Sequence, residues 1–123
     1  MAVGVGLGLA DLPFSCADAY WEWVDMAEDG GVDSMWQTDR LVSPIPILEC
    51  MSAMAAIAGR TRRMKFGMNV ASLGLRDPLL TAKQCATIDF LSNGRLLPAF
   101  GVGSAVAPDW GATGRSPKGS GKV

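Results

Sequence analysis

Short apolar runs alternate with longer amphipathic stretches along this chain, and the alternation predicts strands that are each followed by a helix. The apolar runs predict strands over residues 3–9, 32–38, 64–70 and 96–103. Between them, helical spacing predicts helices over 15–30, 47–58 and 77–93. Strands that alternate with helices form a parallel sheet with right-handed crossovers. The pattern leaves two arrangements open, an open sheet and part of a closed barrel.

Polar residues and glycines predict where the helices begin and end. Ser15 and Asp18 have the spacing of a capping box, which predicts the start of the first helix. Asp77 followed by Pro78 gives the third helix an N-cap and a proline at its first position. Gly59 is expected to end the second helix.

Composition indicates one folded domain. The chain has 123 residues, of which 49% are hydrophobic and 19% charged, and this balance argues against disorder. We expect residues 1–110 to fold and residues 111–123, rich in Gly, Ser, Pro and Lys, to form a flexible tail. The net charge of −1 gives no electrostatic footprint for nucleic acid, and no apolar stretch has the length of a membrane span.

Histidine is absent, which removes the commonest general base and the commonest metal ligand, so we expect no metal. Cys16, Cys50 and Cys85 are widely spaced and odd in number. We interpret them as reduced thiols in a cytoplasmic protein.

Two stretches imitate phosphate-binding loops. The first begins at Gly4, but Leu9 stands where a dinucleotide fingerprint needs its third glycine. The second covers residues 116–123, where Ser116 and Val123 replace key positions of a Walker A loop and no helix follows. We assign neither stretch to nucleotide binding.

Polar residues and glycines also follow the predicted strands. Asp39 and Arg40 follow the second strand, Asn69 and Val70 end the third, and Gly103 ends the fourth. Because the carboxyl ends of parallel strands converge on one face, these residues are candidates for a common site. The alternative is that Asp39 caps a turn and Arg40 is a solvated loop charge, and the residues alone do not decide between the two.

The segment from Asp33 to Arg40 resembles the second-strand motif of the bacterial-luciferase-like oxidoreductases. Similar segments follow in order and at family spacing over residues 55–67, 76–84, 86–96, 101–104, 108–110 and 113–115. The resemblance covers roughly residues 3–119 and implies the first half, about four strands, of a (β/α)8 TIM barrel. It further implies an oxidoreductase or monooxygenase that uses FMN or an 8-hydroxy-5-deazaflavin coenzyme on a small-molecule substrate.

The same resemblance implies roles for individual residues. In this family the third strand ends in a bulge, often with a cis peptide bond, that supports the flavin ring. The match places that bond between Asn69 and Val70 and puts the adjoining Ala71 in the cofactor-binding set. Asp39 matches an acidic position near the reactive edge of the flavin. Arg40 stands where several members carry a catalytic histidine, and a guanidinium cannot shuttle protons near neutral pH but can stabilise an anion.

Gly103 and Ser104 match the backbone turn beside the ring, which completes the cofactor-binding set implied by the resemblance. Ala105 and Val106 follow, where many deazaflavin users carry a glycine and then an acidic or aromatic residue. In this respect the chain departs from those members.

The later strands that hold the cofactor phosphate in this family have no counterpart in the chain, so we expect a truncated form. Two hypotheses follow. One is an oxidoreductase, although activity of the isolated chain stays open. The other is a non-catalytic half-barrel that associates as a homodimer, because two copies carry eight strands. A subunit that completes a separately encoded half is a third interpretation.

Overall fold

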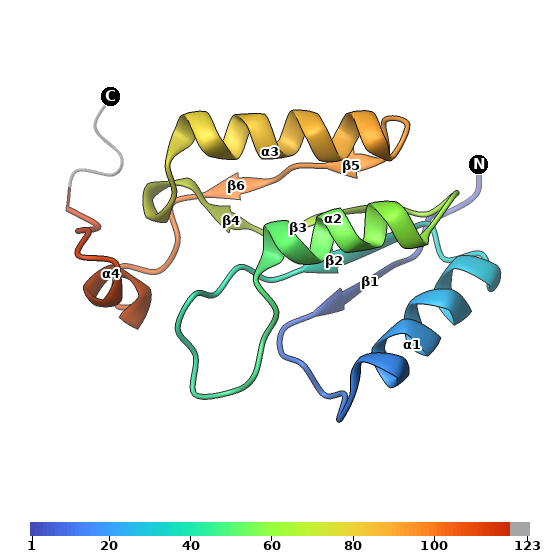
Figure 1. Cartoon of the computed structure of the whole chain (residues 1–123), viewed down its shortest axis with the longest axis horizontal. Helices are drawn as coiled ribbons and strands as arrows, with labels where there is room; N and C mark the ends of the chain where they lie inside the picture. Colours follow the sequence, from blue (N-terminus) through green and yellow to red (C-terminus); the bar gives the residue numbers. More distant parts are fainter. Residues whose placement is uncertain (119–123) are drawn as a thin grey trace.

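A parallel sheet with the strand order β1-β2-β3-β5 forms the centre of the computed structural model, which describes residues 1–118. A second, two-stranded parallel sheet (β4-β6) continues beyond β3 and β5. Helices α1, α2 and α3 cover one face of the strands (Figure 1). The strands are β1 (Gly6–Leu9), β2 (Ser34–Gln37), β3 (Lys65–Met68), β4 (Ala71–Ser72), β5 (Leu96–Leu97) and β6 (Phe100–Gly101). The helices are α1 (Ala17–Asp29), α2 (Cys50–Arg60), the 3-10 turn η1 (Leu73–Leu75), α3 (Pro78–Leu91) and α4 (Pro108–Ala112). The predicted parallel α/β fold is confirmed.

Alternation along the strands sends one row of side chains toward the helices. Leu7, Met35, Phe66 and Leu96 stand side by side in register across β1, β2, β3 and β5. The last three are buried in the core, and Leu7 packs against it. Burying these side chains under the helices is the main driving force that holds the layers together.

On the opposite face of the sheet, glycines leave room for a tryptophan ring to lie close to the backbone. The Trp36 ring lies across Gly6 and Gly67, so that a Cβ on either residue would come within 3.0 Å of the ring. A Cβ on Gly67 would also overlap the Leu97 carbonyl oxygen of the neighbouring strand. The indole Nε1 donates to Ser34 Oγ at 2.9 Å, which fixes the ring on this face.

Two predicted helix starts have different outcomes. The N-cap and proline prediction for α3 is confirmed, because Asp77 Oδ1 accepts the Leu80 N–H at 2.7 Å and Pro78 begins the helix. The capping box predicted for α1 is wrong. Its N-cap is Cys16, with no side-chain cap, because Ser15 lies one residue too early to reach the first-turn amides.

The predicted ends of α2 are also wrong. The helix begins at Cys50, three residues after the predicted start at 47, because Glu49 is the N-cap. Its carboxylate accepts the Met51 and Ser52 amide protons at 3.1 and 2.8 Å. The helix continues through Gly59 to Arg60, because Arg95, directly before β5, caps its last carbonyls and no glycine is needed there.

The third and fourth predicted strands are each interrupted. Pro98, which has no N–H to donate, separates β5 from β6. The strand predicted over 64–70 pairs as β3 and resumes as β4 after a cis peptide bond between Asn69 and Val70. The cis bond implied by the family resemblance is therefore present.

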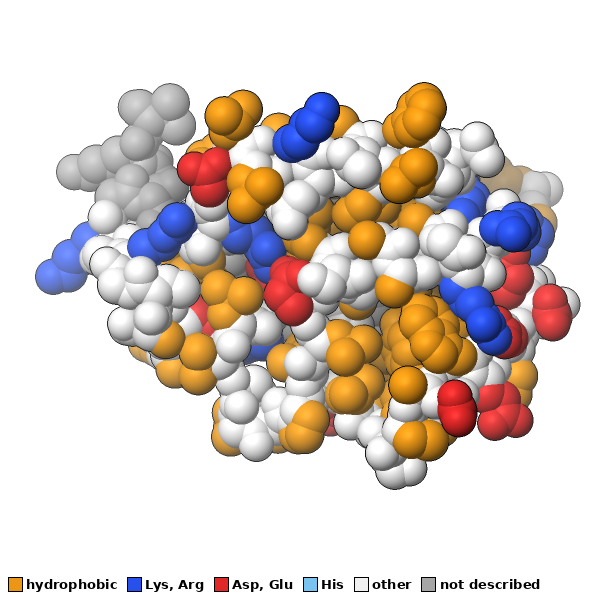
Figure 2. All heavy atoms as spheres, viewed as in Figure 1, with side chains coloured by type: hydrophobic (Ala, Val, Ile, Leu, Met, Phe, Trp, Pro, Cys, Tyr) orange, Lys and Arg blue, Asp and Glu red, His pale blue; other side chains and the backbone are white. Residues whose placement is uncertain are grey.

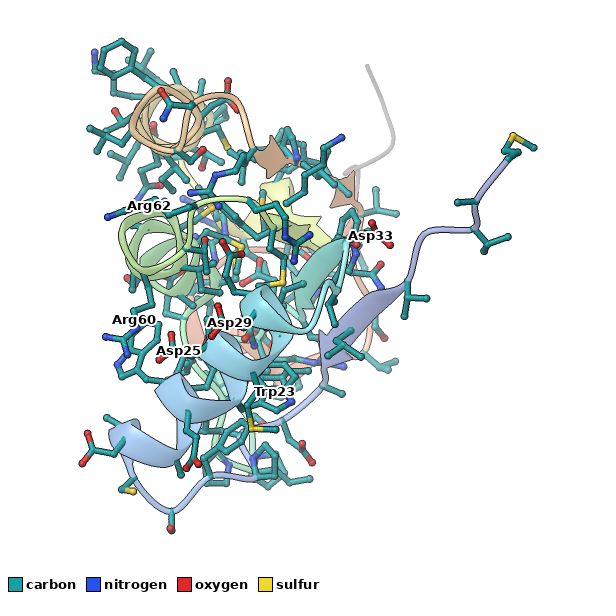
Figure 3. All side chains as sticks on the ribbon, turned by 90° about the vertical axis from the view of Figure 1, so that its right-hand side faces the viewer. Trp23, Asp25, Asp29, Asp33, Arg60 and Arg62 are labelled. Carbon is teal, nitrogen blue, oxygen red and sulfur yellow. The ribbon has the colours of Figure 1, made fainter. Side chains whose placement is uncertain are left out.

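Ion pairing fastens α1 to α2 on the outer surface. Arg60 of α2 binds Asp25 of α1 through Nε at 2.8 Å and Nη2 at 2.5 Å, and both residues are labelled in Figure 3. The guanidinium also lies 5.7 Å from the centre of the Trp21 ring. This pair is half-exposed, so we assign it orientation of the helices rather than much stability.

The C-terminal region packs back onto the strand ends. The predicted boundary between residues 110 and 111 falls inside α4, and Arg115 donates to the carbonyl oxygens of Gly74 and Arg76 at 3.1 and 2.7 Å. Residues 119–123, which contain the end of the predicted tail and most of the Walker A look-alike, lie outside the described residues. Within residues 1–118, no helix combines the length and apolar character needed to cross a bilayer.

Candidate functional site

The carboxyl ends of β2, β4 and β6 meet around a cavity of about 170 Å³. This is the end of the sheet where α4 also lies (Figure 1). Of the seven residues predicted for the site, six line the cavity: Asp39, Arg40, Asn69, Val70, Gly103 and Ser104. The seventh, Ala71, is fully buried and is not among the lining residues. The other lining residues are Thr38, Ser72, Leu75, Ala107, Asp109 and Trp110.

Besides a hollow of about 270 Å³ between α2 and α3, two larger hollows lie away from these residues. One, of about 770 Å³, is an open depression along α1 that includes Asp25 and Arg60. The other, of about 440 Å³, lies between α1 and α2 and is mostly apolar. We base the site on the smaller cavity because only there do the strand ends bring polar groups from separate parts of the chain together.

Asp39 follows β2 and is held by its neighbours on both oxygens. Its side chain is 1% exposed. Oδ1 accepts from Arg76 Nη2 at 2.6 Å, and Oδ2 accepts from Arg76 Nε at 3.2 Å and from the Ser72 amide at 3.0 Å. In this arrangement both carboxylate oxygens are engaged in hydrogen bonds, and Arg76 is the ion-pair partner.

Arg76 was not singled out by sequence reasoning, although it directly precedes the Asp77-Pro78 helix start. Its Nη2 also binds Glu49 Oε1 at 2.8 Å and lies 3.3 Å from Cys50 Sγ. Burial opposes the charge of Arg76, but hydrogen bonds to Asp39 and Glu49 raise its pKa above the ordinary value. The guanidinium therefore joins the end of β2 to the start of α2.

The groups around Arg76 also have the composition of a metal cluster. Asp39, Glu49 and Cys50 offer donor atoms within 4.8 Å of one another. Arg76 already hydrogen-bonds to all three, and its single positive charge offsets part of the negative charge of the two carboxylates. Burial raises the pKa of the Cys50 thiol, which disfavours the thiolate that metals bind. The three side chains thus belong to a network of hydrogen bonds and ion pairs centred on Arg76.

Asp109 of α4 connects the loop after β2 to the far side of the cavity. Its Oδ1 accepts the Leu41 and Val42 amide protons at 2.6 and 3.2 Å, and its Oδ2 lies 3.9 Å from Arg40 Nη1. Burial works against ionisation, but the two amide protons lower the pKa of Asp109 overall. The buried anion therefore holds the Arg40 guanidinium, which is 42% exposed, at the rim.

The turn after β6 forms the remaining wall. Gly103 has a φ of +74°, and a Cβ there would lie 2.6 Å from Ser72 Oγ, so both its backbone angle and the close approach require glycine. The Ser104 carbonyl oxygen accepts from Trp110 Nε1 at 2.9 Å and from the Ala107 amide at 3.1 Å. These bonds fix the turn against α4.

The assembled cavity is suited to binding and orientation. Arg40 offers an exposed cation, Asn69 an amide and Ser104 a hydroxyl, beside the apolar surface of Val70. Small-molecule pockets measure roughly 300–1,000 Å³, so the cavity of about 170 Å³ is smaller than a complete pocket of this kind.

Comparison with known proteins adds to this geometry. The family model described as luciferase-like monooxygenase matches residues 15–115. An F420-dependent glucose-6-phosphate dehydrogenase from Amycolatopsis mediterranei (strain U-32) is 33% identical over 92 residues, covering 69% of this chain and 27% of that protein.

Solved structures share the fold over nearly the whole chain. The coenzyme F420-dependent tetrahydromethanopterin reductase from Methanopyrus kandleri superposes with a TM-score of 0.73 at 27% identity, over 91% of this chain and 30% of that one. The oxygenating constituent of 3,6-diketocamphane monooxygenase from Pseudomonas putida, in complex with FMN, gives a TM-score of 0.78 at 22% identity, over 99% and 35%. The chain thus spans about a third or less of the length of these proteins and matches part of a luciferase-like barrel.

Proposed function

We propose a function on the premise that this chain belongs to the luciferase-like monooxygenase family, whose model matches residues 15–115. The chain binds the ring of an 8-hydroxy-5-deazaflavin coenzyme (F420) or of FMN, and takes part in oxidoreductase chemistry on a small organic molecule. Two similar proteins above 25% identity are F420-dependent by name, which favours the deazaflavin. The cytoplasmic location expected from the sequence stays a prediction.

One observation carries the proposal. Residues from three separate strand ends, which the order of elements along the chain predicts to converge, line the same small cavity. The cavity has an apolar wall at Val70 and hydrogen-bonding groups at Asn69 and Ser104, which suit a planar ring with polar edges. Arg40 is the basic side chain among the lining residues, and the other lining groups named here suit the ring of the cofactor.

The chain's own residues would bind and orient the cofactor ring. When bound, the cofactor supplies the hydride or oxygen chemistry. Asn69, Val70, Gly103 and Ser104 would hold one side of the ring, and Arg40 would stabilise negative charge on the ring or the substrate. Asp39 is bound to Arg76 and Ser72 by hydrogen bonds, so its role is to shape the wall.

Titration of the purified chain with F420 and with FMN, followed by cofactor fluorescence, tests the proposal. We expect saturable binding of one of them with a Kd below about 100 µM, or roughly −5.5 kcal/mol. Gly103→Ala should weaken binding at least about tenfold, because its Cβ would meet Ser72 Oγ in the cavity wall. Gly94→Ala is the matched control, since Gly94 also has a positive φ (+77°) but no atom within 4 Å of its Cβ position.

Two results would overturn the proposal. One is the absence of saturable binding of either cofactor by the unaltered chain at about 1 mM, a concentration at which even weak specific sites fill. The other is an equal effect of the two glycine substitutions, which would show that backbone strain rather than the cavity governs binding.

A second candidate function is self-association of the partial barrel. Among the described residues, β1 and β5 each pair with another strand on one side only. Large hydrophobic side chains are exposed near these edges, with Val5 at 56%, Phe90 at 82% and Leu91 at 67%. Figure 2 shows hydrophobic side chains along α3 at the top of the molecule. Bare strand edges and exposed apolar surface both favour association.

The mass of the chain in solution tests this candidate. Light scattering after gel filtration should give twice the chain mass of 12.9 kDa, because two sets of four strands supply the eight of a closed barrel. A stable, folded monomer at tens of micromolar, the range in which a specific homodimer would form, would exclude the paired barrel.

A further inference from the structure

We propose that Arg76, which does not itself line the cavity, is the positioning residue that fixes the shape of the cavity wall at residues 69–72. This inference rests on the proposed function in so far as the wall is taken to bind a flavin or deazaflavin ring. Arg76 acts on the wall through Asp39, and Asp39 acts through Ser72.

Arg76 holds Asp39 with a fixed geometry. Two of its nitrogens, Nη2 and Nε, reach the two carboxylate oxygens at 2.6 and 3.2 Å. The side chains of Asp39 and Arg76 are 1% and 11% exposed, so the pair is largely removed from water. A charge-assisted pair of this kind sets orientation as well as energy, since the guanidinium is planar and binds with two donors.

Asp39 in turn holds the wall. Its Oδ2 accepts the Ser72 amide proton at 3.0 Å, and Ser72 follows the cis bond at Asn69-Val70 by two residues. Ser72 is also the residue that Gly103 approaches closely from the opposite wall. The position of one carboxylate therefore sets both the segment after β3 and its distance to the turn after β6.

Arg76 is itself fixed by one side-chain partner and by two hydrogen bonds of its backbone. Glu49, the N-cap of α2, binds Nη2 at 2.8 Å, and the Arg76 amide donates to the Leu73 carbonyl oxygen at 3.1 Å. The Arg76 carbonyl oxygen accepts from Arg115 at 2.7 Å. Arg76 thus joins α2, η1 and the segment after α4 behind the wall, and Lys at this position would keep the charge but lose the two-donor geometry.

Arg76→Lys tests the inference, with Arg95→Lys as the matched control. Arg95 is also a buried arginine, but it lies at the start of β5, at the opposite end of the strands. The first readout is amide hydrogen exchange of Ser72, relative to that of Val32, whose amide donates to the Ala27 carbonyl oxygen at 3.1 Å, away from both arginines. The second readout is the Kd for F420 and FMN.

We expect Arg76→Lys to accelerate Ser72 exchange relative to Val32 by about tenfold or more and to weaken cofactor binding by a similar factor, as loss of a charged hydrogen bond does. Arg95→Lys should change both ratios less than about twofold, since it lowers stability without touching the wall. If Arg76→Lys does not fold, Asp39→Asn breaks the same link from the other side and should accelerate Ser72 exchange in the same direction.

Each contrary outcome is decisive. Unchanged relative exchange at Ser72 in Arg76→Lys overturns the inference, and so does an equal effect of Arg95→Lys on cofactor affinity. If the unaltered chain binds neither cofactor, the proposed function fails, whereas the Ser72 exchange ratio still decides the role of Arg76.

Discussion

Replacing Arg95 with methionine removes a buried cation that closes the amino-terminal end of the sheet. The Arg95 side chain donates five hydrogen bonds. They go to the carbonyl oxygens of Ser92, Met64, Ala58 and Thr61 and to Thr61 Oγ1, at 2.6 to 3.0 Å. The residue is 9% exposed, so water cannot readily replace these bonds.

The magnitude follows from the groups left without a donor. Four carbonyl oxygens lose their Arg95 partner, and at about 1 kcal/mol net for each lost bond the cost is about 4 kcal/mol. Methionine keeps an apolar contact with Phe66, whose ring centre lies 5.2 Å from the guanidinium, and this offsets the lost stacking. Such a loss is a large fraction of the roughly 5–15 kcal/mol that stabilises a domain.

Urea unfolding followed by tryptophan fluorescence measures the effect, with an unchanged slope showing that the same surface unfolds. The matched control is Arg62→Met, because Arg62 is exposed (Figure 3 labels it) and should change stability by no more than about 0.5 kcal/mol. A loss below about 1 kcal/mol for Arg95→Met would refute the assignment of Arg95 as the cap of α2.

Three further substitutions test the N-cap of α3, the packing within the sheet and the dependence of stability on pH in acid. Asp77→Ala should lower the free energy of unfolding by about 1 kcal/mol in urea melts, since it removes the N-cap of α3. Gly67→Ala should cost about 3 kcal/mol or more, because its Cβ would overlap the Leu97 oxygen, whereas Gly59→Ala, with no atom within 4 Å, should be neutral or mildly stabilising. Burial opposes ionisation of Glu49, but its hydrogen bonds dominate and lower its pKa from 4.5 to about 2. The stabilisation from Glu49 is therefore complete above pH 4.5 and is lost as the pH falls toward 2. Glu49→Gln should flatten the dependence of stability on pH in that window, and an unchanged slope would contradict the hydrogen-bonding scheme.

Local rules of sequence predicted most of the elements but not all of their ends. The start of α3 was predictable because Asp77 and Pro78 act within one helical turn. The end of α2 was not, because the group that caps it, Arg95, lies more than thirty positions away in the sequence. A rule for glycine at helix ends therefore placed the boundary at Gly59, where no left-handed residue is required.

The candidate site also has one part that the sequence predicts and another that it does not. Convergence of strand ends is a property of parallel topology, so the order of elements was enough to bring Asp39, Asn69 and Gly103 to one cavity. The partners of Asp39 depend on side-chain direction across the fold. Arg76, which binds Asp39, is 37 positions away in the sequence. Asp109, which lies 3.9 Å from Arg40, comes from α4, a helix that the sequence pattern did not indicate. Pairwise charge contacts of this range carry no periodic signal along the chain.

The indole of Trp36 also limits what can sit opposite the sheet. Its ring occupies the space over Gly6 and Gly67 and is tethered by Ser34 Oγ. Strands that close this partial barrel must leave space opposite the indole. The interior of an eight-stranded barrel is only wide enough for its side chains to fill, so two large side chains cannot face each other there. Trp36 therefore requires small side chains on the strands that face it in the closed barrel.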